Sequence, residues 1–403
     1  MLKRWSAGRG NCFKMNSSWL PDSCQITATR HLAAFAGSSD YVPLGLSLRN
    51  AFSINRYEYL NDLDALFANE HAKAVAQAAI RSDLVPCLVV RHDPVVLPCL
   101  FGGEVANVGG RPMFEPFLQS IDSLWRLLPP SLESAVARRA FHAIEHFKAH
   151  APAGTVVCKP PQLDPFDAAL LMYGSDLLMD MVEEPKVIAR FLDAITDAFV
   201  LLERRFKQLL GEPLRESVTY LGVVIPGVRV AADSMVNLSP DMIRRFCFPI
   251  FEHLAREFGG VLVHYCPSPS LKYYHVLETM AECPAVIGVD TSGSIDYLDD
   301  PANGARLDLR LTQVADCAIR PPDFTTATKD LHPNININQF AVREWDRLGQ
   351  WIEGEFLATH RKQGRGVVLR ATVDSIEEGR ELHAFWQRLF SATPRRIAVR
   401  PCS

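Results

Sequence analysis

The chain is predicted to be an α/β protein whose parallel strands close into a (β/α)8 TIM barrel. Short apolar runs, which are typical of strands buried on both faces of a parallel sheet, alternate with amphipathic stretches along the 403 residues. This alternation repeats eight times, as a closed barrel requires. No Gly-x-Gly-x-x-Gly turn follows an early apolar run, which argues against an open doubly wound sheet.

The strands are predicted from the apolar runs, and the helices from apolar residues that recur every three or four positions. The expected strands cover residues 42–48, 86–91, 155–158, 218–225, 261–264, 286–290, 334–338 and 366–370. The expected helices cover residues 59–80, 132–150, 168–210, 241–258, 271–281, 310–316, 342–363 and 375–390.

The domain organisation is predicted to be simple. Residues 1–25 contain Gly, Asn and Ser but no periodic pattern, which indicates a flexible N-terminal extension. Residues 26–403 are expected to form a single barrel domain. Within it, residues 92–130 are rich in Pro and Gly and form a loop insertion, and loops of this length are often lids or binding loops.

Composition and charge restrict the function classes. The net charge is −4 and no long basic run occurs, which argues against a nucleic-acid partner. No apolar run approaches the length of a membrane span, and no apolar segment follows the basic residues at the N-terminus as in a secretory signal. The ten cysteines follow no spacing pattern, which predicts reduced thiols and a cytoplasmic location.

His264 and Cys266 are the leading candidates for a functional site. They follow the apolar run 261–263, where residues two apart on an extended segment point to the same side. An imidazole and a thiol are therefore expected at the carboxyl end of a strand, where α/β proteins place their chemistry. Both groups bind divalent metals such as zinc. The alternative is a hydrogen-bonded core histidine beside a buried thiol.

Other polar residues follow or end the predicted strands. Because a barrel gathers strand ends at one mouth, one pocket is expected to contain Asp233, His264, Cys266, Asp290 and Arg370. Arg370 would pair with Asp233 or Asp290, or bind an anionic substrate. Similar positions are held by Arg91, which ends one strand, and by Asn336, which lies in another. Ion pairs, caps and ordinary turn chemistry are the alternative interpretations of these residues.

Several short motifs occur in a fixed order between about residues 29 and 389. They are the segment 30–43, the loop Phe101–Glu104, the stretch 173–185, Asp233 with 238–242, and His264-Tyr265-Cys266. In order and spacing the chain resembles the uroporphyrinogen decarboxylase superfamily, which includes cobalamin-dependent methyltransferases. The resemblance implies a (β/α)8 barrel enzyme, and the His-x-Cys motif is similar to that of the methyltransferase branch.

That branch implies a methyl transfer between a small substrate and the cobalt of a corrinoid. The corrinoid would come from a partner protein, and zinc would bind at His264 and Cys266. Methyltransferases of this kind have a third zinc-binding cysteine after the last strand, whereas residues 369–375 contain none. The third ligand is therefore uncertain, and Asp374 or Cys317 could supply it.

The resemblance also implies substrate-binding roles for Arg49 and Asn336, and the position of Arg91 at a strand end makes it a third substrate-binding candidate. Decarboxylases of the superfamily grip several propionates with N-terminal arginines, but only Arg49 stands in that region here, so uroporphyrinogen is not the expected substrate. Asp233, His264, Asp290 and Arg370 are the catalytic candidates. Two other functions stay open: a decarboxylase-type lyase acting on another substrate, and a non-catalytic binding barrel. A homodimer is also left open.

Overall fold

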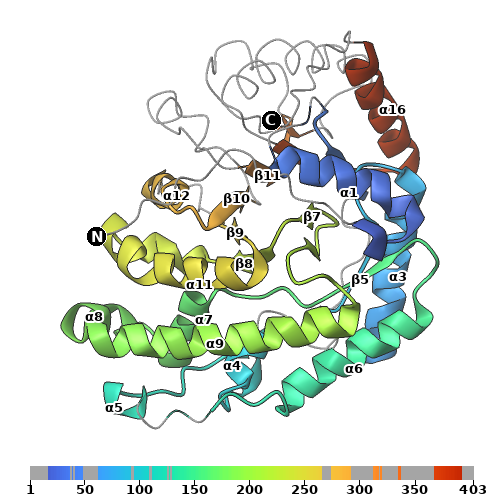
Figure 1. Cartoon of the computed structure of the whole chain (residues 1–403). Coiled ribbons are helices and arrows are strands. Elements are labelled where there is room, and N and C mark those ends of the chain that lie inside the picture. The colour runs from blue at the N-terminus through green and yellow to red at the C-terminus, as the bar shows by residue number, and fades with distance from the viewer. Residues whose placement is uncertain are drawn as a thin grey trace.

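The computed structural model in Figure 1 describes most of the chain. The described residues are 17–36, 39, 41–48, 62–91, 95–108, 111–124, 127, 129–265, 274–291, 312–316, 318–319, 335–336 and 367–392. Three candidates from the sequence lie outside them, namely Arg49, Cys266 and Cys317. The helix predicted over 342–363 lies outside them as well.

A six-stranded parallel sheet forms the centre of the molecule. Its strand order is β1 (Leu44–Leu48), β14 (Val367–Val373), β11 (Thr312–Asp316), β10 (Val286–Thr291), β9 (Val261–His264) and β8 (Val228–Ala231). All five neighbouring pairs are parallel. The prediction that residues 261–264 and 366–370 belong to one parallel sheet is therefore confirmed.

A second parallel sheet pairs β2 (Cys87–Val89) with β5 (Val156–Cys158). The chain beyond β5 meets the end of β8, where Asp164 N donates to Ala231 O at 2.8 Å. The chain before β2 meets β1, where Asp83 N donates to Leu44 O at 3.0 Å. Ala231 N also donates to Gln162 O at 2.9 Å, so Leu163 and Ala231 form an isolated parallel bridge. The two sheets are therefore linked by backbone hydrogen bonds at both of their edges. Closure into a continuous barrel stays a prediction.

Three of the predicted elements are wrong. Residues 218–225 do not form a parallel strand, because they contain the antiparallel hairpin of β6 (Ser217–Val218) and β7 (Val224–Ile225). The predicted helix 310–316 is instead strand β11, whose polar residues hid the strand pattern. In the predicted strand 334–338, β13 (Ile335–Asn336) pairs antiparallel with β12 (Ala318–Ile319) and joins neither parallel sheet.

The long helices of the described chain lie where periodicity placed them, except α1 (Asp22–Phe35), which the sequence did not predict. They are α1, α3 (Leu63–Ile80), α6 (Ala135–His150), α7 (Pro165–Tyr173), α8 (Asp176–Glu183), α9 (Pro185–Leu210), α11 (Phe248–Phe258), α12 (Tyr274–Ala281) and α16 (Ile376–Ala392). The predicted helix 168–210 divides into three, because Gly174 has a φ of +84° and Pro185 begins α9. The predicted boundary at residue 25 falls inside α1.

The insertion 92–130 carries small elements of its own. They are α4 (Val96–Cys99), the antiparallel strands β3 (Val105–Val108) and β4 (Arg111–Phe114), and α5 (Ile121–Leu124). Helix α11 packs against β9, and α9 packs against α11 and α6, so Figure 1 shows successive helical layers beside the strands. Among the described residues, no helix has the length and apolar content to cross a bilayer.

Asp83 connects elements at the amino ends of the strands. Its carboxylate accepts from Arg30 Nη1 at 2.6 Å, Tyr41 Oη at 2.5 Å and Leu44 N at 3.0 Å. Its backbone oxygen lies 2.9 Å from His31 Nε2 of α1. Because Val224 N donates to Nδ1 of the same ring at 3.1 Å, His31 also holds the β6–β7 hairpin.

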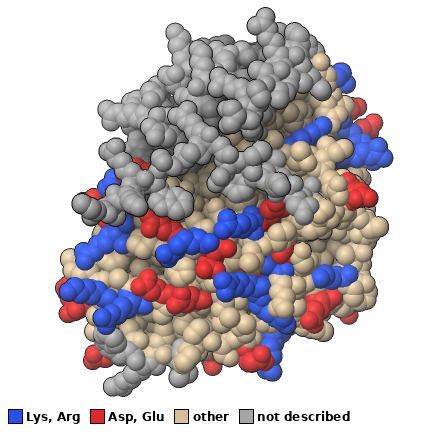
Figure 2. All heavy atoms as spheres, viewed as in Figure 1, with Lys and Arg blue, Asp and Glu red and all other residues tan. Residues whose placement is uncertain are grey.

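A second buried network of charges joins β5, α9 and β6. Lys159 pairs with Glu203, and Lys207 Nζ lies 3.9 Å from Glu203 Oε1 and 3.6 Å from Glu212 Oε2. Lys207 Nζ also donates to Ser217 Oγ at 2.6 Å. On the described part of the surface in Figure 2, by contrast, cationic and anionic side chains are interspersed.

Candidate functional site

The candidate site lies at the carboxyl ends of β8, β9 and β10. His264 ends β9 and is in register with Ala231 of β8 and Asp290 of β10. Asp233 follows β8 by two residues and begins a short 3-10 helix over Asp233–Asn237. The parallel register therefore places three side chains that the sequence had singled out at the same edge of one sheet.

The imidazole of His264 lies between two carboxylates. Its Nδ1 is 3.4 Å from Asp290 Oδ2, and its Nε2 is 4.0 Å from Asp233 Oδ1. The Asp290 side chain is 1% exposed, whereas that of Asp233 is 48% exposed. One ring nitrogen therefore faces a buried anion within the sheet, and the other faces the more open carboxylate at the mouth. The predicted grouping of Asp233, His264 and Asp290 is present.

Arg229 of β8 is a buried partner of Asp290 that the sequence analysis missed. Its Nε donates to Asp290 Oδ2 at 2.6 Å, and its Nη2 donates to Tyr220 Oη at 3.1 Å. The guanidinium carbon also lies 4.5 Å from the centre of the Tyr220 ring. The sequence signal for this residue was an arginine within the apolar run 228–232. It was overlooked because the fourth strand was predicted at 218–225 instead.

Charge controls the ionisation of Asp290. Burial alone would raise the pKa of this carboxyl, but Arg229, His264 and Arg370 act against burial and hold the pKa well below its usual range. Arg370 is half-buried in β14, and its charge acts to lower the pKa of Asp290; its predicted ion pair with Asp233 or Asp290 stays a prediction. Asp290 is therefore an anion at neutral pH.

Two further carboxyl groups lie beside Asp233. Asp164 caps α7, and its Oδ1 accepts from Asp167 N at 2.7 Å. Asp167 in turn accepts from Ser234 N at 3.1 Å. Burial, together with the negative charge of Asp233, raises the pKa of Asp164 to about 7. Burial and the charges of Asp164 and Asp233 raise the pKa of Asp167 well above its usual value.

These two groups can hold a proton next to the mouth at neutral pH. The sequence analysis missed them because Asp-Pro at 164–165 is an ordinary way to begin a helix. The only sequence feature that could have indicated this pair is Asp167, a second aspartate three residues after Asp164, at the end of the first helical turn.

The other predicted side chains are placed differently. Arg91 donates from Nε to Glu70 Oε1 at 3.1 Å, and Lys73 and Asn69 share that oxygen, so the ion-pair interpretation of Arg91 holds. Asn336 lies in β13, which pairs with β12 and not with a strand of either parallel sheet. Asp374 is exposed before α16, where its backbone N donates to Glu378 Oε2 at 2.8 Å.

One feature of this edge suits a metal site, namely the carboxylate beside the histidine. A histidine that binds a metal through one nitrogen usually donates from the other to a carboxylate, as His264 faces Asp290. In the described part of the chain, no three His, Cys, Asp or Glu side chains gather into a metal-binding group. The predicted zinc site includes Cys266, which lies outside that part, so the zinc site stays a prediction.

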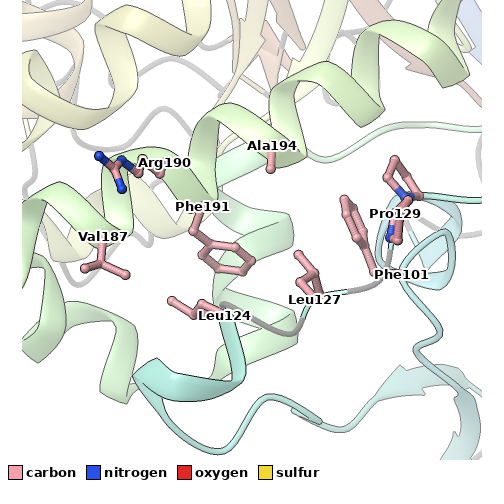
Figure 3. Close-up of a pocket in the computed structure, with 9 residues that line it drawn as sticks. Phe101, Leu124, Leu127, Pro129, Val187, Arg190, Phe191 and Ala194 are labelled. Atoms are coloured by element: carbon pink, nitrogen blue, oxygen red, sulfur yellow. The ribbon is translucent and has the colours of Figure 1, made fainter.

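A separate hollow of about 220 Å³ lies between the insertion and α9. Its lining is almost wholly apolar: Phe101, Leu124, Leu127, Pro129, Pro130, Val187, Arg190, Phe191 and Ala194. In Figure 3 the Arg190 guanidinium points away from the Phe191 ring. None of the candidate residues predicted from the sequence lines this hollow.

The chain was compared with known proteins. Neither a protein-family model nor a curated protein matches it. Among solved structures, a methyltransferase from Methanosarcina mazei is similar, with a TM-score of 0.55 and 15% sequence identity. The likeness covers 90% of this chain and 99% of that one. At this identity the comparison concerns the fold, and the chain therefore shares the fold of a methyltransferase over most of its length.

Proposed function

We propose that the chain is a methyltransferase that moves a methyl group between a small substrate and a corrinoid carried by a separate protein. The observation that carries this proposal is the position of His264 at the carboxyl edge of a parallel sheet. Asp290 lies beside its Nδ1, and its Nε2 faces the half-exposed Asp233. The similarity in fold to a solved methyltransferase supports it. The proposal includes closure of the eight parallel strands into a (β/α)8 barrel of the uroporphyrinogen decarboxylase type.

In this proposal His264 and Cys266 hold a zinc ion, with Asp374 or Cys317 as the candidate third ligand. Zinc would supply a Lewis acid for the heteroatom that bears the methyl group. Asp290 orients His264 from behind and remains ionised because Arg229 and Arg370 lie near it. A thiolate paired with an imidazole suits zinc better than hard cations, which prefer oxygen ligands.

Asp233 is the catalytic carboxylate nearest the substrate. It is half-exposed at the mouth and lies 4.0 Å from the imidazole, so it can contact a bound substrate directly. Asp164 and Asp167 lie behind it and hold a proton that a departing heteroatom would need. Arg49 and Asn336 remain proposed substrate contacts.

The lyase alternative requires an arginine that holds a substrate carboxylate. Arg91 donates a hydrogen bond to Glu70, and the positive charge of Arg370 helps to lower the pKa of Asp290. Protein carboxylates therefore already compete for both of the arginines that this alternative invoked. The geometry favours methyl transfer over decarboxylation.

Metal content and methyl transfer together test the proposal. Wild-type protein purified without added zinc should retain about one equivalent of zinc after dialysis, and His264→Ala and Cys266→Ala should lose it. Cys283→Ala is the matched control, because Cys283 is a buried thiol after α12 with no place in the site. Methyl transfer is followed by the absorbance change between cob(I)alamin and methylcobalamin with methylated alcohols, amines and thiols.

The outcomes separate the parts of the proposal. Equal zinc in wild type and Cys266→Ala would contradict the metal site. A wild type that holds zinc but methylates cobalamin from no donor would contradict the corrinoid reaction. Asp374→Cys should tighten zinc binding if Asp374 is the third ligand, since a thiolate is the softer group.

A further inference from the structure

We infer that His146 and His150 of α6 form a metal site of their own, which takes a divalent ion of the nickel or copper type. The two residues are four positions apart, so they lie on the same face of the helix, one turn from each other. Helix α6 runs along the outer side of the molecule in Figure 1. The inference is independent of the proposed function, because it uses none of the residues of that site.

The spacing of the two imidazole rings suits one shared ion. Their centres are 4.5 Å apart, and their planes are tilted by 36°. A metal–nitrogen bond of about 2.1 Å places each ring centre about 3.2 Å from the ion, so two ligands at a right angle have ring centres about 4.5 Å apart. Two ligands at a tetrahedral angle would have ring centres about 5.2 Å apart. The observed spacing therefore favours the tetragonal geometry of nickel and copper over the tetrahedral geometry of zinc.

A hydrogen bond and a neighbouring ring hold this pair in place. Nδ1 of His150 lies 2.8 Å from the backbone oxygen of His146, which can only accept a hydrogen bond. A backbone carbonyl is a usual partner for the ring nitrogen of a metal-binding histidine that does not face the ion. Nε2 of His150 is then the nitrogen available to the ion. Phe67 of α3 packs edge-on against both rings, with ring centres 5.6 and 5.9 Å away, so the pair is ordered before an ion binds.

Asp64 of α3 supplies negative charge beside the pair. Its Oδ1 lies 3.7 Å from Nε2 of His146, which is too long for a hydrogen bond but close enough to attract a cation bound at that nitrogen. The Asp64 side chain is 94% exposed, so it can turn toward the ion. Because no three such side chains gather in the described ranges of the chain, water completes the coordination, and Asp64 acts through its charge.

Packing of aromatic rings accounts for only part of this arrangement. Phe67 also packs against His71 and Phe147, so an aromatic cluster exists without any ion. His150 is exposed, however, and its contact with His146 removes little surface from water. Packing therefore does not explain why a second imidazole lies beside the first, whereas a shared ion does.

Nickel titration of the full-length chain without a polyhistidine tag tests the site. The protein is dialysed against a chelator, and Ni²⁺ alone is then added in a calorimeter. His146→Ala and His150→Ala should each weaken nickel binding about 10-fold or more, because the second imidazole no longer binds as an intramolecular ligand. Asp64→Asn should weaken nickel binding about two- to fivefold, as expected for an exposed charge near the ion.

His253→Ala is the matched control. His253 of α11 lies 3.8 Å from Asp197 Oδ1, but no histidine stands four positions before or after it. A single histidine beside a carboxylate should contribute nothing measurable, so nickel affinity should stay at the wild-type level. His264→Ala removes the zinc site of the proposed function and should also leave this nickel site intact. Failure of the proposed function and failure of this inference are therefore distinguishable.

NMR and thermal unfolding supply further readouts. Ni²⁺ is paramagnetic, so in ¹⁵N-histidine-labelled protein it should first broaden the ring signals of His146 and His150, which the two alanine variants assign. Because the ion binds the folded helix, Tm should rise with nickel concentration in the wild type and not in His150→Ala.

Four results would overturn the inference. They are a wild type that binds no nickel, nickel affinity unchanged in His150→Ala, an equal loss of affinity in His253→Ala, and first broadening at other histidines. His150 is exposed at the end of α6, so its variant should fold and decides the question if His146→Ala does not.

Discussion

His383 and Asp83 are 300 positions apart in the sequence, yet His383 Nε2 lies 3.1 Å from Asp83 Oδ2. His383 belongs to α16, the last helix described, and Asp83 precedes β2. The same carboxylate accepts from Tyr41 and Leu44 at the start of β1. One buried side chain therefore joins the first strand to the last helix at the amino ends of the strands.

Acid should unfold the protein through this region. Burial lowers the pKa of His31 to about 4, from 6.5, and outweighs the opposing charge of Asp83. Between these pH values the unfolded chain binds more protons than the folded one. The free energy of unfolding should therefore fall as pH drops from 6.5 to 4, by on the order of 3 kcal/mol.

A second loss should follow at lower pH. Burial would raise the pKa of Asp83, but the hydrogen bonds from His383, Tyr41 and Leu44 lower it to about 2. Its contribution is present above pH 3.8 and is lost as pH falls toward 2. Urea denaturation at several pH values checks both steps. His31→Gln should flatten the upper one, whereas the exposed His142→Gln should leave it unchanged.

Loss of one charge from the Lys159–Glu203–Lys207–Glu212 network should be strongly destabilising. Glu203→Gln leaves two buried lysines facing a single carboxylate, and breaking a buried pair in this way typically costs about 3–5 kcal/mol. Glu257→Gln removes the exposed partner of Arg204 and should cost less than about 1 kcal/mol. Equal midpoints for the two variants in guanidinium chloride would show that the network contributes no more than a surface pair.

Asp164→Asn should stabilise the protein at alkaline pH. The pKa of Asp164 is raised to about 7, so its stabilising protonated form is lost as pH rises through 7. Asparagine is an equally good helix cap and cannot ionise. We expect Tm to exceed that of the wild type by a few degrees at pH 8 and by less at pH 5. Asp62→Asn, at the exposed cap of α3, should show no such pH dependence.

Gly227→Ala should disturb the β8–β9 pair. Gly227 has a φ of +125°, and a Cβ atom at this position would lie 2.1 Å from Gly260 O. We expect a loss of more than about 2 kcal/mol of stability, because backbone must move in addition to the conformational cost. Gly211→Ala has a similarly positive φ of +78° but open space around it, and should cost about 1 kcal/mol. Similar losses in both variants would contradict this contact.

Much of the fold could be predicted because buried parallel strands leave continuous apolar runs. The strand 261–264 is such a run, and the structure confirms it as β9. β11 could not be recognised in the same way, because Thr312, Gln313 and Asp316 interrupt its apolar character. The run 218–225 is equally apolar, yet Gly222 with a φ of +74° turns it into a hairpin.

The candidate site was partly predictable for a related reason. Asp233, His264 and Asp290 could be grouped because each follows or ends a strand, and parallel strands bring such ends together. Arg229 lies in the middle of a strand, where a charged residue has no position rule to reveal it. Its role depends on which strands are neighbours, and that order comes only from the fold.

Helix α1 and the β6–β7 hairpin have a consequence for the order of reaction steps. They cover the amino ends of the strands: α1 packs against β7 and β14, and Val85 N donates to Gly222 O at 2.9 Å. In the proposed function, ligands exchange at the opposite edge, where His264 and Asp233 lie. A large protein seated on that edge would block exchange while it remained bound. Turnover with the proposed corrinoid partner should then follow a compulsory sequence, in which the small substrate enters before the partner docks and leaves after it has dissociated.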